Sequence, residues 1–260
     1  MENTSYPLVA AGFIALTILC LALIVAGAYT TFRRMGLSLD VARKRTLLLA
    51  AVLLLWTAFV SLLSLQGILS DFESRPPKLF LVLLVTFVVV VVLMTRPSFR
   101  RFLAHVPPSW LIYLQVFRVP VELFLWLLFL EGLAPVQMTF EGRNLDVLTG
   151  LTAPVAAFLC FGQGRNLTRL AALWNLLGFA LLLNIVITAI LSMPTPFRVF
   201  MNEPANTIVT QFPVVFLPAI LVPLAYSLHF FSLLQLYGKK QAAAQTPLPT
   251  TGTFNQQLNP

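Results

Sequence analysis

The sequence predicts an all-α fold, a seven-transmembrane helical bundle with its N-terminus outside and its C-terminus in the cytoplasm. Three observations support this fold: 58% of the 260 residues are hydrophobic and only 10% are charged, long apolar runs follow one another along the chain, and Lys and Arg gather in alternate connections. A soluble domain carries about 25% charged residues. The composition therefore favours a membrane protein before any motif is considered.

Each apolar run approaches or exceeds the length of a bilayer-spanning helix, which needs about 20 residues. Backbone groups in lipid must be satisfied within the segment, and the runs are too continuous for barrel strands, so helices are expected. The predicted spans are residues 7–31, 46–69, 79–95, 110–130, 145–161, 170–192 and 212–237. They form one predicted domain, 1–237. The remaining residues, 238–260, are rich in Gln, Thr and Pro and are predicted to be a disordered cytoplasmic tail.

Basic residues predict the orientation. Twelve of the 17 Lys and Arg residues lie in the connections 33–45, 96–101 and 165–169 or directly after the last span, and four lie in the connections on the other side. Connections on the cytoplasmic side of a membrane carry this excess. We therefore expect the lipid bilayer as the partner of this chain. Nucleic acid is not expected, since apolar runs separate the basic residues.

Cysteine and metal-binding patterns are weak. Cys20 and Cys160 both lie inside apolar runs, where cysteine usually acts as a small packing residue. His105 lies in a connection, and neither a histidine cluster nor an HExxH motif is present, so no metal site and no cofactor are predicted. Every lysine lies in a connection, which argues against a retinal-type Schiff base in the last span.

The span at 110–130 differs from the others because a polar face runs through it. At about 100° per residue, Gln115, Arg118, Glu122 and Trp126 fall within an arc of about 80°. Ionisable side chains at this depth are costly, and they usually face protein or water. Arg118 and Glu122 are four residues apart, so we expect them to form an ion pair on one helix face.

Two later spans carry polar residues at a similar depth. Asn175 lies in the sixth span, and Tyr226 and His229 lie in the seventh. Asn175 and Asn184 lie on opposite faces of the sixth span, which predicts that this helix is central in the bundle. The candidate substrate-binding or relay residues are Gln115, Arg118, Glu122, Asn175, Tyr226 and His229.

The connection before the fifth span allows two interpretations. In the first, Asn144 caps the following helix and Asp146 favours its dipole. In the second, the connection is an outer mouth that folds onto the bundle and contributes Glu141, Arg143, Asn144 and Asp146 as ligands. The longer connection 193–211 is a candidate lid.

Four stretches between about residues 110 and 235 carry a resemblance. They are LQVFRVPVELFLW, MTFEGRNLDVLTGLTAP, WNLLGFALLLNIV and FPVVFLPAILVPLAYSLHF. Together they resemble an uncharacterised family of bacterial multi-pass membrane proteins. The resemblance implies a bacterial inner membrane and implies no activity.

Three functions stay open at this point. The first is binding or transport of a small polar solute, an ion or a proton at the candidate cluster. The second is an intramembrane enzyme in which His229 or Glu122 acts as acid or base and Arg118 holds an anion, although no nucleophile or metal set accompanies them. The third is a sensor or assembly partner in which the Arg118–Glu122 pair is purely structural. The sequence does not predict the oligomeric state.

Overall fold

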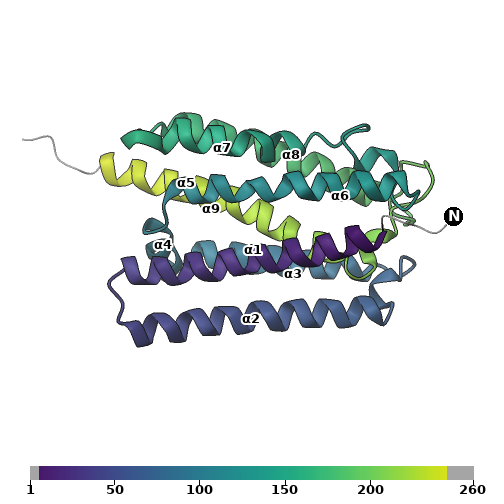
Figure 1. Cartoon of the computed structure of the whole chain (residues 1–260), viewed down its shortest axis with the longest axis horizontal. Coiled ribbons are helices and arrows are strands. Elements are labelled where there is room, and N and C mark those ends of the chain that lie inside the picture. The colour runs from purple at the N-terminus through teal and green to yellow at the C-terminus, as the bar shows by residue number, and fades with distance from the viewer. Residues whose placement is uncertain (1–5, 245–260) are drawn as a thin grey trace, which may run out of the picture.

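The computed structural model describes residues 6–244, and all regular structure in this range is helical (Figure 1). The α-helices are α1 (Tyr6–Arg34), α2 (Leu39–Leu65), α3 (Lys78–Thr95), α4 (Pro97–Ala104), α5 (Pro108–Tyr113), α6 (Arg118–Leu130), α7 (Val147–Phe161), α8 (Thr168–Leu191) and α9 (Val222–Ala244). Short 3-10 turns are η1 (Ile68–Ser70), η2 (Leu114–Phe117), η3 (Val136–Met138), η4 (Gly162–Gly164) and η5 (Ile208–Thr210), and a π-helical segment, η6 (Leu217–Leu221), precedes α9.

Seven helical stretches of the described residues are long and apolar enough to cross a bilayer. The fourth stretch joins α5, η2 and α6, and the seventh joins η6 to α9. Successive stretches run in opposite directions, so the two termini lie at opposite ends of the bundle (Figure 1). The predicted all-helical architecture, with seven helices long and apolar enough to span a bilayer, is confirmed.

One end of the bundle collects the basic connections. The α1–α2 and α7–α8 connections lie there together with α4, on the left in Figure 1. We call this the basic end, because Arg33, Arg34, Arg100, Arg101 and Arg165 all lie in these segments. The opposite end carries the connections from α6 to α7 and from α8 to α9, and we call it the mouth end.

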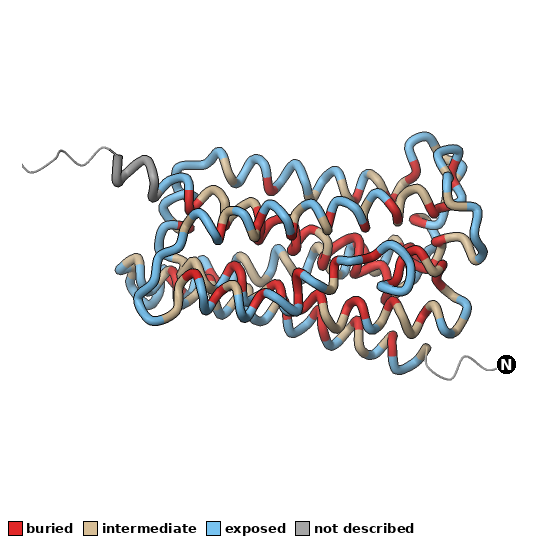
Figure 2. The backbone as a smooth tube through the Cα atoms, turned by 90° about the horizontal axis from the view of Figure 1, so that it is seen from above, coloured by how far each residue is buried: buried red, intermediate tan, exposed pale blue. Residues whose placement is uncertain are grey.

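The seventh stretch forms the centre of the bundle. In its most apolar 18-residue segment 67% of the residues are buried, against 28% in the corresponding segment of α8 and 11% in that of α2. The prediction that the sixth span is central is wrong. Asn184 is exposed, and its Nδ2 donates to the Arg143 carbonyl at the mouth end, so it needs no buried partner face. Figure 2 shows buried residues along the inner helices and exposed ones on the outside.

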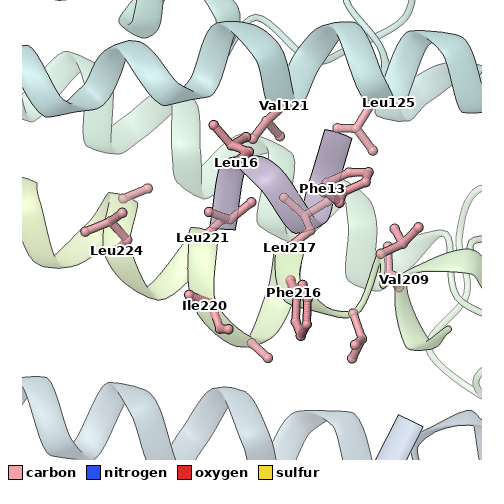
Figure 3. Packing of buried hydrophobic residues seen from close by; sticks show 14 of the residues in the cluster. Phe13, Leu16, Val121, Leu125, Val209, Phe216, Leu217, Ile220, Leu221 and Leu224 are labelled. Carbon is pink, nitrogen blue, oxygen red and sulfur yellow. The ribbon is translucent and has the colours of Figure 1, made fainter. Parts of the chain in front are cut away.

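Apolar side chains from α1, α6 and the start of the seventh stretch meet in the core (Figure 3). Phe13 packs its ring against Phe124 with centroids 5.2 Å apart. The labelled residues around them are Leu16, Val121, Leu125, Val209, Phe216, Leu217, Ile220, Leu221 and Leu224. α1 thus contacts both α6 and η6, while α5 and η2 contact α9 directly and bring the fourth stretch beside the seventh.

Prolines accompany two irregular segments of the inner helices. Pro120 has no N–H to donate to the Val116 carbonyl, and the preceding residues wind as the 3-10 turn η2. Pro223 leaves the Ala219 carbonyl without its usual donor, and η6 widens into a π-helix. The indole Nε1 of Trp56 on α2 donates to that carbonyl at 3.1 Å, which satisfies it from a neighbouring helix.

The predicted tail begins as an extension of the last helix. α9 continues from Val222 to Ala244, past the expected start of disorder at residue 238. Residues 245–260 lie outside the described range, so their disorder stays a prediction.

Candidate functional site

The fourth stretch presents its polar face to the interior. Gln115, Arg118 and Glu122 are all at most 2% exposed. Arg118 is the first residue of α6, directly after the 3-10 turn η2, and Glu122 follows one turn later. The helix face that the sequence spacing predicted to be polar is therefore turned toward the interior of the protein.

Arg118 forms its ion pair with Asp146, not with Glu122. Its Nε lies 2.7 Å from Asp146 Oδ2, and its Nη2 lies 2.6 Å from Asp146 Oδ1. The expected pair within α6 is wrong, because the connection 139–146 folds inward and brings both carboxylate oxygens of Asp146 close to the guanidinium. The Nε contact is a charge-assisted hydrogen bond, and the Nη2 contact adds a close ion pair.

Glu122 is held by Asn144. The Nδ2 of Asn144 lies 2.6 Å from both carboxylate oxygens of Glu122, and 3.0 Å from the Met138 carbonyl. The Oδ1 of Asn144 accepts the backbone N–H of Asp146 at 3.0 Å, which fixes the orientation of the amide. Its NH₂ group must therefore face Glu122, and Glu122 acts as an acceptor.

The first interpretation of this connection is corrected by the same contacts. The helix α7 begins after Asp146, which occupies the N-cap position without a side-chain capping bond. Asn144 lies two residues earlier and turns its side chain inward to Glu122. The inward positions of Asn144 and Asp146 agree with the other interpretation, in which the connection folds onto the bundle.

His229 continues the network on the other side of Arg118. Arg118 Nη1 lies 3.1 Å from His229 Nε2, and since a guanidinium only donates, that ring nitrogen accepts. His229 Nδ1 then carries the hydrogen and donates to Asn175 Oδ1 at 3.0 Å. Asn175 Nδ2 donates to Ser232 Oγ at 2.9 Å and to the Ala171 carbonyl at 2.8 Å. The hydrogen bonds thus assign His229 as a neutral imidazole.

These contacts join residues from three helices, α6, α8 and α9, and from the connection before α7 into a single polar network. Its members are Glu122, Asn144, Asp146, Arg118, His229, Asn175 and Ser232. Sequence reasoning did not include Ser232. The available signal was its position three residues after His229, on a neighbouring face of the same helix.

Two glycines make room for the network. A Cβ added to Gly178 on α8 would lie 2.7 Å from His229 Cε1. A Cβ added to Gly150 on α7 would lie 2.8 Å from Val119 Cγ2 and 3.3 Å from Arg118 Cβ. Because neither glycine has a side chain, α7 and α8 can close around the buried polar groups.

Two candidate residues of the inner cluster lie outside the network. Gln115 Nε2 donates to the Ala225 carbonyl at 3.2 Å, which ties η2 to α9. The ring of Tyr226 meets the edge of Phe87 on α3, with centroids 6.0 Å apart. Tyr226 is three residues before His229, about 60° away around the helix, and this angle turns it toward α3.

The two other mouth residues stay at the exposed rim. Glu141 accepts the indole N–H of Trp126 at 2.6 Å. The Arg143 guanidinium lies over the Phe200 ring at 5.3 Å from its centroid. Of the four predicted mouth ligands, the structure therefore brings Asn144 and Asp146 into the buried network and leaves Glu141 and Arg143 outside it.

The network contains one positive group and two carboxylates. Arg118 stays protonated, and His229 is neutral by its hydrogen bonds. Asp146 neutralises Arg118 by direct contact. Glu122 has amide hydrogen bonds but no ion pair with Arg118, so its charge is the one left without a direct counter-ion.

A cavity of about 70 Å³ opens beside this second carboxylate. Its wall is formed by α6, α8 and η6, with Leu83 of α3 on one side. Glu122 and Asp146 are the charged residues of the wall, and the others are mainly aliphatic, such as Val186 and Pro218. The volume is large enough for a few water molecules or a small cation beside Glu122.

Comparison with protein families places the network in a known unit. Residues 76–237 match the sequence model of a domain of unknown function (DUF8737). The chain belongs to this family. No curated protein and no solved structure shows significant similarity to the chain.

The DUF8737 domain contains every member of the polar network, from Arg118 to Ser232. It begins just before α3 and ends in α9, so α1 and α2 lie outside it. The cavity is likewise lined from Leu83 to Val222, entirely within the matched residues.

Proposed function

We propose that this membrane protein binds a proton or a small cation at Glu122, and that it moves this ion, or a small polar solute coupled to it, across the membrane. The single observation that carries the proposal is the position of Glu122. It is a buried carboxylate on the wall of a cavity, and its hydrogen-bond donor is an amide rather than a cation.

Electrostatics supports an exchangeable positive charge at this position. A buried carboxylate without a counter-ion is costly, and a proton or a cation in the cavity would remove that cost. Asp146 is unsuited to the same task, because Arg118 already occupies both of its oxygens.

The helices beside the cavity support a moving bundle. The 3-10 turn η2 lies directly before Arg118, and the π-helical segment η6 contributes Leu217 and Pro218 to the cavity wall. Interrupted helices of this kind often occur at functional sites of membrane proteins. From Arg118 the network continues along α9 through His229 to Ser232, toward the basic end.

An enzymatic role has less support. Both ring nitrogens of His229 are already used, one by Arg118 and one by Asn175. A general base needs a free nitrogen within reach of its substrate. The purely structural alternative assumed an Arg118–Glu122 pair, and the guanidinium is paired with Asp146 instead.

The proposed setting is a bacterial inner membrane, with the basic end in the cytoplasm and the N-terminus outside. The excess of Lys and Arg at that end supports this orientation. The resemblance of residues 110–235 to bacterial multi-pass proteins supports the compartment. Membrane-impermeant labelling of single cysteines placed at residue 34 and at residue 141 tests the orientation: label from outside should reach only residue 141.

Proton flux into proteoliposomes tests the function directly. With a potassium diffusion potential and a pH-sensitive dye inside, the wild-type protein should acidify the lumen, and Glu122→Gln should lose most of this flux. Glu141→Gln, at the exposed rim, is the matched control and should keep it. Equal flux from wild type and Glu122→Gln, or no proton or cation uptake by the folded wild type, would contradict the proposal.

A further inference from the structure

A groove on the outside of the bundle is separate from the polar network. It runs between α1 and the α5–η2 stretch near the basic end, and it encloses about 430 Å³. Its lining residues are Leu23, Ala26, Gly27, Thr30, Trp110, Tyr113 and Leu114. None of these residues belongs to the cavity beside Glu122.

Helical spacing explains the shape of this groove. The α1 residues recur at intervals of three and four, so they form one stripe about 10 Å long. Ala26 has a small side chain and Gly27 has none, so the middle of the stripe leaves room for the groove. Closer to the basic end, the Phe32 ring of α1 packs against the Phe102 ring of α4, with centroids 5.0 Å apart. The groove is therefore open along its side and closed at the basic end.

The closed end carries a cation and two interfacial aromatic residues. The Arg34 guanidinium lies 4.8 Å from the centroid of the Trp110 ring, and the Arg34 side chain is exposed. None of the ion pairs found among the described side chains of residues 6–238 involves Arg34. Trp110 and Tyr113 are partly exposed, as is typical of aromatic side chains at the level of lipid headgroups.

We propose that this groove binds one anionic phospholipid of the surrounding leaflet. Its acyl chain lies along the Leu23–Thr30 stripe, and its phosphate contacts Arg34. The apolar, half-open groove matches a flexible hydrocarbon chain, and the Arg34 cation beside Trp110 matches an anionic headgroup. A zwitterionic headgroup would bring an ammonium group toward the guanidinium, so the site should prefer phosphatidylglycerol to phosphatidylethanolamine.

Native mass spectrometry of the full chain in detergent, with phosphatidylglycerol and phosphatidylethanolamine of equal chain length, tests this preference. Wild type should retain phosphatidylglycerol more strongly. Arg34→Gln should weaken its binding about fivefold, the effect of one basic residue near an anionic lipid surface. Arg165→Gln removes an exposed arginine at the same end and is the matched control, which should bind as wild type.

A second variant tests the acyl-chain half of the groove. Ala26 is exposed on the stripe, so Ala26→Phe fills the groove without entering the core. It should weaken the binding of both lipids, while circular dichroism shows an unchanged helix content. Equal retention of the two lipids by wild type, equal losses in Arg34→Gln and Arg165→Gln, or unchanged binding by Ala26→Phe would each overturn the proposal. None of these outcomes depends on ion binding at Glu122.

Discussion

The two carboxylates of the polar network lie close together and are held in different ways. Asp146 contacts Arg118 through both oxygens, so its charge is matched within the protein. Glu122 lines the same cavity as Asp146 and is held by the amide of Asn144. The first arrangement stabilises the packing of α6 against α7, and the second leaves a charge that a ligand can neutralise. Burial alone therefore does not separate a structural carboxylate from a binding one, whereas its partner does.

The largest loss of stability should follow from breaking the ion pair between Arg118 and Asp146. Asp146→Ala leaves the Arg118 guanidinium buried without its partner, and should lower the free energy of unfolding by about 3–5 kcal/mol. Denaturant unfolding in detergent, followed by circular dichroism, measures this loss. Arg118→Met combined with Asp146→Leu removes both charges and should recover most of the stability. A double variant as unstable as Asp146→Ala would show that the ion pair is not the cause.

An intermediate effect should follow from crowding His229. In Gly178→Ala the new Cβ would lie 2.7 Å from His229 Cε1, so the ring or the helix must shift. Overpacking of this kind costs about 1–3 kcal/mol. Leu177→Ala, on the exposed face of the same helix, should change stability by less than about 0.5 kcal/mol. Thermal unfolding of both variants compares them, and equal shifts would speak against a tight contact at His229.

The smallest change in stability should follow from Glu122→Gln. The substitution keeps an acceptor for Asn144 and removes the unmatched charge, so the free energy of unfolding should change by less than about 1 kcal/mol. The same denaturant titration measures it. A loss as large as that of Asp146→Ala would place Glu122 in the structural half of the network and remove the distinction between the two carboxylates.

The sequence predicted the fold well because membrane helices are specified locally. Length and apolarity define each span, and the inward face of the fourth span follows from helical spacing alone. These local signals predict that Gln115, Arg118 and Glu122 lie inside the bundle, and all three side chains are buried.

The pairing between helices was not predictable in the same way. Arg118 and Glu122 satisfy the spacing of an ion pair, and only the inward fold of the 139–146 connection brings Asp146 closer. Asn144 and Asp146 also fit a helix start, so their local pattern favoured capping. Tyr226 shows the limit of helical spacing, since about 60° of rotation separates it from His229 and directs it to Phe87.

Infrared difference spectroscopy of the protein in bilayers, recorded as the pH is lowered, tests the role of Glu122 most directly. A buried carboxylate that takes up a proton gains the C=O stretch of a carboxylic acid. Exposed carboxyl groups also protonate as the pH falls, so the diagnostic band is the one at higher frequency that belongs to a carboxyl shielded from water. We expect this band in wild type and in Glu141→Gln, and its loss in Glu122→Gln. The band would also weaken when a competing cation fills the cavity. A band that persists unchanged in Glu122→Gln would contradict the assignment of Glu122 as the ion-binding carboxylate.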